Sequence, residues 1–293
     1  MDMPRSLLLA GATGQIGRSL LPRLLAAGWQ VHALSRRPVD ADGMLPCVHW
    51  VTGDLTDARL VPPAVQVVVS AGPLDHFAHW YRHSGCDAPR IIAFGSTSEQ
   101  TKQASEDPHE RALVARLQQA GQWLLADGRA RGAGVTLLRP TLVWGAGMDR
   151  SLTPMAALAR RWGHLALPAD ACGLRQPVHV DDLADAVMAL LDCPVSHGRT
   201  YDLAGGEVLS YDRMVARVLA ASGVRSRLWK LPAGLFGVGV GMARHAGWLQ
   251  GLTPAVLARM RQDLVFDNRP AAMDFGYAPR PFRPTASALG LDQ

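Results

Sequence analysis

The first half of the chain alternates short apolar runs with longer amphipathic segments. Ser6–Ala10 is one such run, and it has the character of a strand buried on both faces of a parallel sheet. From about Gln15 to Ala27 apolar side chains recur at helical spacing, and Gly28 is well placed to end that helix. Further strands are predicted at Gln30–Leu34, His49–Thr52, Val65–Ser70, Ile91–Phe94, Val135–Leu138 and Thr200–Leu203, and further helices at Pro108–Ala126, Asp181–Leu191 and Tyr211–Ser222.

This order of elements predicts an α/β fold, in which a doubly wound parallel sheet of the Rossmann type is followed by a small, mostly helical C-terminal domain. We expect residues 1–165 to form the sheet domain and 176–206 to return to it. Residues 207–293 are expected to form most of a substrate-side domain. Neither an internal repeat nor a low-complexity linker interrupts the chain.

A glycine-rich loop, Gly11-Ala12-Thr13-Gly14-Gln15-Ile16-Gly17, lies between the first predicted strand and the first predicted helix. In a dinucleotide-binding loop the first glycine permits a tight turn, the second lets the backbone approach a pyrophosphate, and the third lets helix and strand pack closely. The free N–H groups of the helix N-terminus then attract the phosphates. The strand before the loop and the helix after it favour this interpretation over that of a merely structural turn.

The end of the second predicted strand indicates which dinucleotide is bound. NAD-binding proteins usually carry an acidic residue there, whereas this chain has Ser35-Arg36-Arg37. Guanidinium groups suit a 2′-phosphate, so the sequence favours NADP over NAD. The alternative is that both arginines are solvated surface charges.

A series of motifs in chain order resembles the extended or atypical short-chain dehydrogenases/reductases, the NAD-dependent epimerase/dehydratase group. Besides the glycine loop, they are Gly53-Asp54-Leu55, Ser70-Ala71-Gly72, Ser96-Thr97-Ser98, Leu138-Arg139-Pro140, Val143-Trp144-Gly145, Val178-His179-Val180-Asp181-Asp182 and Tyr201-Asp202-Leu203-Ala204-Gly205-Gly206. The resemblance spans about the first 205 residues and implies an NAD(P)-dependent oxidoreductase or an epimerase/dehydratase-like enzyme acting on a small polar or carbonyl-bearing substrate. The implied cofactor-binding residues are Gly11, Thr13, Gly14, Gln15, Ile16, Gly17, Ser35, Arg36, Arg37, Asp54, Leu55, Ser70, Ala71, Gly72 and Arg116.

The catalytic pair of that family, Tyr-x-x-x-Lys, is replaced here by Ala112 and Arg116. The resemblance still places Thr97 at the catalytic Ser/Thr position and Glu99 where dehydratases carry a catalytic glutamate. Three outcomes stay open. The chain is a redox enzyme that uses another acid, a redox-neutral enzyme, or a sensor or assembly protein that binds the dinucleotide without turnover. The neighbouring candidates for another acid are Lys102, His109, Glu110 and Glu99.

On the substrate side, the resemblance makes Trp144 and Arg175 the expected contacts. Arginine suits a carboxylate or phosphate group, although a surface salt bridge is an equal alternative for Arg175. His179 with Asp181 and Asp182 invites a catalytic or metal interpretation, but a helix start with Asp181 as N-cap is favoured.

Composition limits the partners. The formal net charge is +5, but no arginine cluster exceeds the pairs Arg36-Arg37 and Arg160-Arg161, so nucleic-acid binding is not expected. Four cysteines without metal-ligand spacing predict neither a zinc site nor a disulfide framework, and a cytoplasmic location is expected. No apolar run is long enough for stable membrane insertion. The apolar, glycine-rich stretch Leu231–Leu252 is open to three interpretations: a pocket lid, a homodimer face or a peripheral membrane contact.

Overall fold

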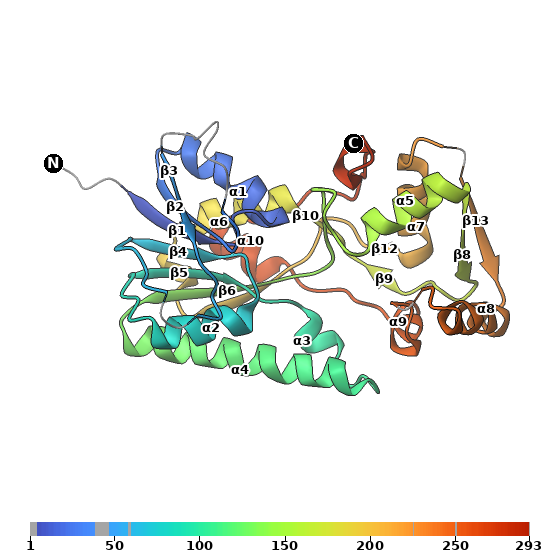
Figure 1. Ribbon diagram of the computed structural model, residues 1–293, viewed down its shortest axis with the longest axis horizontal. Helices are drawn as coiled ribbons and strands as arrows, with labels where there is room; N and C mark the ends of the chain where they lie inside the picture. Colours follow the sequence, from blue (N-terminus) through green and yellow to red (C-terminus); the bar gives the residue numbers. More distant parts are fainter. Residues whose placement is uncertain (1–4, 39–46, 58–59, 225, 250, 293) are drawn as a thin grey trace.

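The computed structural model describes residues 5–38, 47–57, 60–224, 226–249 and 251–292. Seven strands form one sheet in the order β11-β6-β5-β4-β1-β2-β3, and every neighbouring pair is parallel (Figure 1). The strands are β1 (Ser6–Ala10), β2 (Gln30–Ser35), β3 (Val48–Thr52), β4 (Val67–Ser70), β5 (Arg90–Phe94), β6 (Gly134–Pro140) and β11 (Arg199–Leu203). The predicted α/β fold with a doubly wound parallel sheet is therefore confirmed.

Helices cover both faces of this sheet, as Figure 1 shows. On one face lie α1 (Gln15–Ala26), α6 (Val180–Leu190) and α10 (Arg269–Phe275), and on the other lie α2 (Leu74–His83) and α4 (Pro108–Ala130). Because strand side chains alternate between faces, Leu7 and Leu9 enter the core beneath α1 and α6, whereas Leu8 enters the core beneath α2 and α4. Both cores are apolar, which explains why the β1 run is apolar at successive positions.

A third apolar core belongs to a smaller lobe beyond the carboxyl ends of the strands (Figure 1). Its elements are α5 (Leu152–Trp162), β8 (His164–Pro168), α7 (Tyr211–Ala221), β13 (Arg227–Leu231), α8 (Ala233–His245) and α9 (Pro254–Arg259). In this lobe α5 packs on α7, and β8 pairs in parallel with β13. The lobe core thus includes α5, and we propose that the second domain begins before residue 152 rather than after 165.

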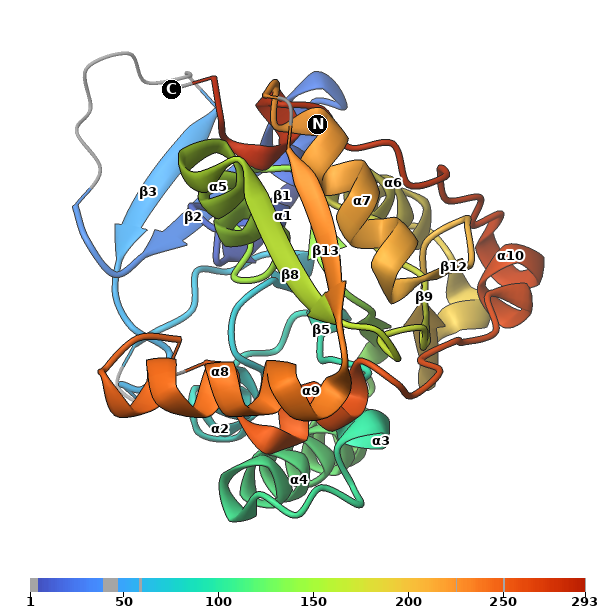
Figure 2. The same ribbon diagram turned by 90° about the vertical axis from the view of Figure 1, so that its right-hand side faces the viewer.

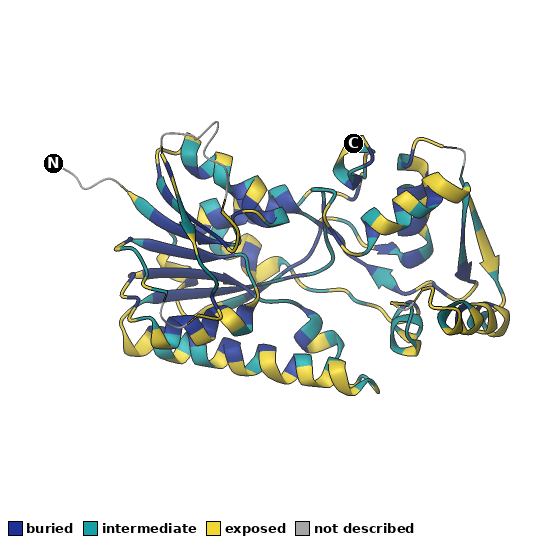
Figure 3. Cartoon of the chain, viewed as in Figure 1, coloured by how far each residue is buried: buried dark blue, intermediate teal, exposed yellow. Residues whose placement is uncertain are grey.

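Short elements join the two parts of the chain. They are α3 (Ser98–Thr101), β7 (Val143–Trp144), β9 (Leu174–Arg175), β10 (Val178–His179), β12 (Leu209–Ser210) and the 3-10 turns η1 (Pro194–Ser196) and η2 (Ser287–Leu289). Between these crossings α6 packs along α1, where the Ser19 hydroxyl donates to Asp181 at 2.6 Å. Figure 3 shows that burial follows this plan, since the dark strands of the sheet contrast with the exposed outer faces of α4 and α8.

Candidate functional site

The glycine loop connects β1 to α1 through a tight turn. Gly11 has a φ of +80°, and a Cβ there would lie 2.9 Å from the backbone carbonyl carbon of Ala71 after β4. A Cβ at Gly17 would lie only 2.2 Å from the carbonyl oxygen of Gly11. The Gly14 N–H closes the turn by donating to that same oxygen at 2.9 Å. The spacing of the glycines is therefore required by close backbone packing between β1, α1 and β4.

The N-terminus of α1 is suited to receive an anion. Its N-cap residue, Gly14, has no side chain to bind the first N–H groups, and the first turn holds no acidic residue. Two buried polar atoms nearby in sequence, Gln15 Oε1 and Ser70 Oγ, have no hydrogen-bond partner within the described part of the chain. Since buried polar groups are normally paired, these residues fit a bound dinucleotide, whose phosphates and hydroxyls supply acceptors and donors.

At the end of β2, Ser35 is buried, whereas Arg36 and Arg37 are exposed. Among the described residues neither guanidinium is in an ion pair within 4.0 Å. The charge of Arg36 nevertheless acts on Asp54, whose pKa is lowered first by a hydrogen bond from the Thr56 backbone N–H and also by that arginine. Two free cations beside a carboxylate thus lie where the adenosine end of a dinucleotide is expected.

The expected contacts Leu55, Ala71 and Gly72 surround the same edge. Leu55 is buried, and its Cδ1 lies 3.7 Å from the position of a Cβ on Gly72. Ala71 donates its backbone N–H to Ala10 at the end of β1. The structure therefore brings the glycine loop, the end of β4 and the turn after β3 together, as the motif series predicts.

The expected catalytic pair lies at the carboxyl ends of β5 and β6, where both side chains are buried and already bonded. Thr97 is 6 % exposed, and its hydroxyl donates to the carbonyl oxygen of Pro140 at 3.1 Å. Glu99 accepts a hydrogen bond from Arg139, whose Nε in turn contacts Asp202 at 2.7 Å. Because Glu99 is a paired carboxylate, it is poorly placed to donate a proton, whereas the Thr97 oxygen keeps lone pairs that can accept from a ligand.

The positions that replace the family pair do not face this cluster. Ala112 and Arg116 are exposed on α4, and Arg116 Nε lies 3.3 Å from the carboxylate of Asp75 on α2. The predicted cofactor contact of Arg116 stays a prediction, and in this structure its charge is directed to the neighbouring helix.

None of the four tyrosines supplies the missing phenol. Tyr81 is fully buried on α2, and Tyr211 begins α7 in the smaller lobe. The hydroxyl of Tyr201 donates to Asp274, and that of Tyr277 donates to the carbonyl of Ala204. A proton relay through tyrosine therefore has no residue to carry it.

The neighbouring acids are also committed or exposed. Glu110 accepts hydrogen bonds from Arg259 and Ser105, and Lys102 Nζ lies 3.1 Å from it. Burial alone would raise the pKa of Glu110, but these partners together lower it to about 2. His109 is exposed in the first turn of α4. Glu110 is therefore ionised at neutral pH and holds two cations.

Trp144 and Arg175 are both deeply buried, which differs from the surface salt bridge considered for Arg175. The Arg175 guanidinium donates to the backbone carbonyls of Leu174, Gln262 and Arg259, and it lies over the ring of Tyr211. Its described contacts join β9 to the 259–262 segment. A direct substrate contact by Arg175 stays a prediction.

His179, rather than Asp181, is the N-cap of α6, so the predicted cap is wrong by two residues. The imidazole Nδ1 accepts from the Asp181 N–H at 3.1 Å, and burial lowers the pKa of His179, which keeps that acceptor neutral. Asp181 pairs with Arg23 and Asp182 with Arg280. Within the described ranges no group of three or more His, Cys, Asp or Glu side chains is arranged to hold a metal ion.

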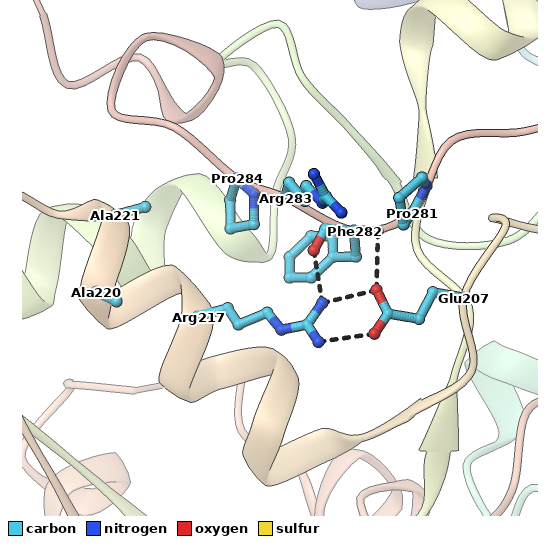
Figure 4. A pocket seen from close by; sticks show the side chains of 8 residues that line it. All are labelled: Glu207, Arg217, Ala220, Ala221, Pro281, Phe282, Arg283 and Pro284. Carbon is cyan, nitrogen blue, oxygen red and sulfur yellow. Dashed lines mark hydrogen bonds and ion pairs between the residues drawn. The ribbon is translucent and has the colours of Figure 1, made fainter.

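Two hollows open beside the 280–288 segment of the smaller lobe. One, of about 520 Å³, has the paired Glu207 and Arg217 on one side and Phe282 as its floor (Figure 4). The other, of about 340 Å³, is lined by Trp144, His179 and residues of this segment. Only Trp144 among these residues was expected at the substrate site, so the volume of a hollow does not by itself locate the chemistry.

The fold and the loop define an NAD(P)-binding protein. Residues 11–122 match the family model described as NAD(P)H-binding. The chain is 27% identical over 316 residues to a 2-alkyl-3-oxoalkanoate reductase from Stenotrophomonas maltophilia (strain K279a), with 94% of each chain covered. It is 24% identical over 237 residues to NADH dehydrogenase (ubiquinone) 1 alpha subcomplex subunit 9, mitochondrial, from Dictyostelium discoideum, with 74% of this chain and 64% of that relative covered.

A solved structure shares the fold. The epimerase Mth375 from Methanothermobacter thermautotrophicus superposes with a TM-score of 0.71 at 14% identity, over 98% of this chain and 90% of that one. The predicted resemblance to extended short-chain dehydrogenases/reductases and NAD-dependent epimerases/dehydratases is thus confirmed. No helix in the described part of the chain is both long and apolar enough to span a bilayer.

Proposed function

We propose that this chain is an NADP(H)-dependent oxidoreductase that acts on a carbonyl-bearing substrate. The observation that carries the proposal is the glycine loop at the uncapped start of α1, with the unpaired cations Arg36 and Arg37 at the end of β2. A 2′-phosphate between two guanidinium groups accepts charge-assisted hydrogen bonds, whereas NAD has no group to occupy them. Asp54, in the field of Arg36, is the proposed contact for the adenine.

The proposed substrate lies at the carboxyl ends of β5 and β6, next to Thr97, with Trp144 from β7 as a further contact. Bound NADPH supplies a hydride, and the chain's own residues must orient the carbonyl group. The Thr97 hydroxyl is the candidate for that task, since its proton is held by Pro140 and its lone pairs stay available. The S. maltophilia relative is named for 2-alkyl-3-oxoalkanoates, so a 3-oxo carboxylate is the substrate class we propose to test first.

Cofactor preference is tested by titration calorimetry with NADPH and NADH. We expect NADPH to bind more tightly, and the double variant Arg36→Ala/Arg37→Ala to lose about 10- to 100-fold in NADPH affinity with little change for NADH. Arg213→Ala is a matched control, because Arg213 is an exposed arginine on α7 outside the proposed site. Tighter binding of NADH to the unchanged chain contradicts the preference for NADP.

A second candidate is a dinucleotide-binding protein without turnover. The observation that favours it is the exposure of Ala112 and Arg116 on α4, together with the absence of a tyrosine beside Thr97. The two functions are separated by following NADPH absorbance at 340 nm with a 2-alkyl-3-oxoalkanoate and a panel of other carbonyl compounds. Turnover that falls at least tenfold in Thr97→Val supports the enzyme, and tight NADPH binding without oxidation for any compound supports the second candidate.

A further inference from the structure

The end of the smaller lobe farthest from the seven-stranded sheet is formed by α8, β13 and the residues that follow α8 (Figure 2). Large apolar side chains are exposed on it. We call this the lobe-end surface, and it consists of Trp162, Trp229, Leu235, Val238, Met242, Trp248 and Leu249. Two of the indoles, Trp162 and Trp248, stack on one another with ring centroids 6.5 Å apart.

The helix α8 is apolar on two opposite sides. Phe236 and Val240 are buried toward the lobe, whereas Leu235, Val238 and Met242 form an outward stripe. Val238 is 62% exposed and Met242 70%. A helix that is apolar all round is normally covered on all sides. The outward stripe therefore lacks the cover that its sequence is suited to.

The backbone of α8 is also poorly adapted to water. Gly234, Gly237, Gly239 and Gly241 lie within the helix, and a Cβ at any of them would meet no atom within 4 Å. These glycines are thus not required by packing inside the chain. Glycine is the least favourable helix residue after proline, and an apolar environment, which penalises unpaired backbone groups, stabilises such a helix.

The charge around the lobe-end surface is one-sided. Between Asp212 and Asp263 the chain has no aspartate or glutamate. Arg227 donates its backbone N–H to Gly163, directly after Trp162, and Arg161 precedes that indole. Both arginines are exposed, and neither takes part in an ion pair among the described residues. Lys230 and Arg261 are neutralised by Asp212 and Asp170 at the edges.

We propose that the lobe-end surface binds reversibly to an anionic lipid surface. Trp162, Trp229 and Trp248 lie at headgroup level, and the outward stripe of α8 enters the acyl boundary, as in interfacial helices. Arg161 and Arg227 contact the lipid phosphates. A second copy of the chain is a poorer occupant, because a two-fold interface apposes identical patches and would bring unpaired arginines together without carboxylates.

Binding is tested by flotation of the full chain with vesicles of phosphatidylcholine alone and with one-third phosphatidylserine. We expect at least tenfold stronger binding to the anionic vesicles, and quenching of tryptophan fluorescence by lipids brominated on the acyl chain. The variant Val238→Glu/Met242→Glu should lose at least tenfold in binding. The matched control is Val61→Glu/Met273→Glu, since these residues are 80% and 85% exposed elsewhere on the molecule.

Retained NADPH affinity and circular dichroism show that each variant is folded, and Arg161→Gln/Arg227→Gln tests the charge separately. We expect that pair to reduce anionic binding several-fold without altering NADPH affinity. Equal binding to both vesicle types, no binding to either, or the same loss in the control variant overturns the proposal. It is also wrong if ultracentrifugation shows a dimer that Val238→Glu/Met242→Glu converts to a monomer, because the surface is then a subunit interface.

Discussion

Glu110 in the first turn of α4 accepts two hydrogen bonds from Arg259 at the end of α9, at 2.5 and 2.7 Å. This pair connects the helix layer of the sheet with the smaller lobe, and Lys102 joins it from the residue after α3. All three side chains are largely shielded from solvent. The contact spans the two parts of the molecule next to the segment that carries Thr97, so it bears on how closely the lobe approaches the proposed site.

Removing the carboxylate should weaken this connection. We expect Glu110→Ala to lower the free energy of unfolding by about 2 kcal/mol, because Arg259 and Lys102 are then left close together without a counter-charge. Urea denaturation measures the change, and Glu106→Ala, at an exposed glutamate nearby, should alter stability by less than about 0.5 kcal/mol. A neutral Glu110→Ala variant would show that the pair contributes no stability.

The same carboxylate should contribute to acid sensitivity. Its pKa in the folded protein is about 2, below the value of an unfolded glutamate, so the folded state binds its proton less readily. The stabilisation is present in full above the unfolded pKa and is lost as pH falls through the unfolded value toward about 2. Urea denaturation of the unchanged chain and Glu110→Ala at pH 6, 4 and 3 should show a shrinking stability difference. A constant difference would contradict this linkage.

Two glycine-to-alanine changes should act in opposite directions. In Gly17→Ala the new methyl group meets the Gly11 carbonyl oxygen at 2.2 Å, so we expect a loss of about 3 kcal/mol and of NADPH binding. In Gly239→Ala the methyl group enters open space on α8, and a gain of about 0.5–1 kcal/mol is expected. Thermal unfolding with and without NADPH tests both. Similar effects of the two variants would refute the packing argument.

Arg175 should matter for stability before it matters for substrate. Its guanidinium donates to three backbone carbonyls, and a lysine cannot reproduce that fork. We expect Arg175→Lys to lower the free energy of unfolding by about 2 kcal/mol, with no change in NADPH affinity. The measurement is urea denaturation alongside calorimetry. A variant of unchanged stability whose KM alone rises would instead support the predicted substrate contact.

The sequence by itself determined the sheet and the nucleotide loop. The predicted strands all exist within one or two residues of their expected ends, because a continuously apolar run is suited only to a strand covered on both faces. The loop was predictable since the spacing of Gly11, Gly14 and Gly17 is a local backbone requirement that three neighbouring segments impose. Arginine at the end of β2 was equally visible, and its exposure leaves the NADP prediction open to test.

Only the tertiary structure decided how the other side chains are used. The burial of Arg175 and the pairing of Glu110 with Arg259 depend on segments far away in sequence. His179 replaced Asp181 as the N-cap because the local sequence allows either, and packing against Trp144 selects one. Likewise, the apolar composition of α8 was plain, but its periodicity does not show which side is covered. That depends on the lobe core, which buries Phe236 and Val240 and leaves the stripe with Val238 facing outward.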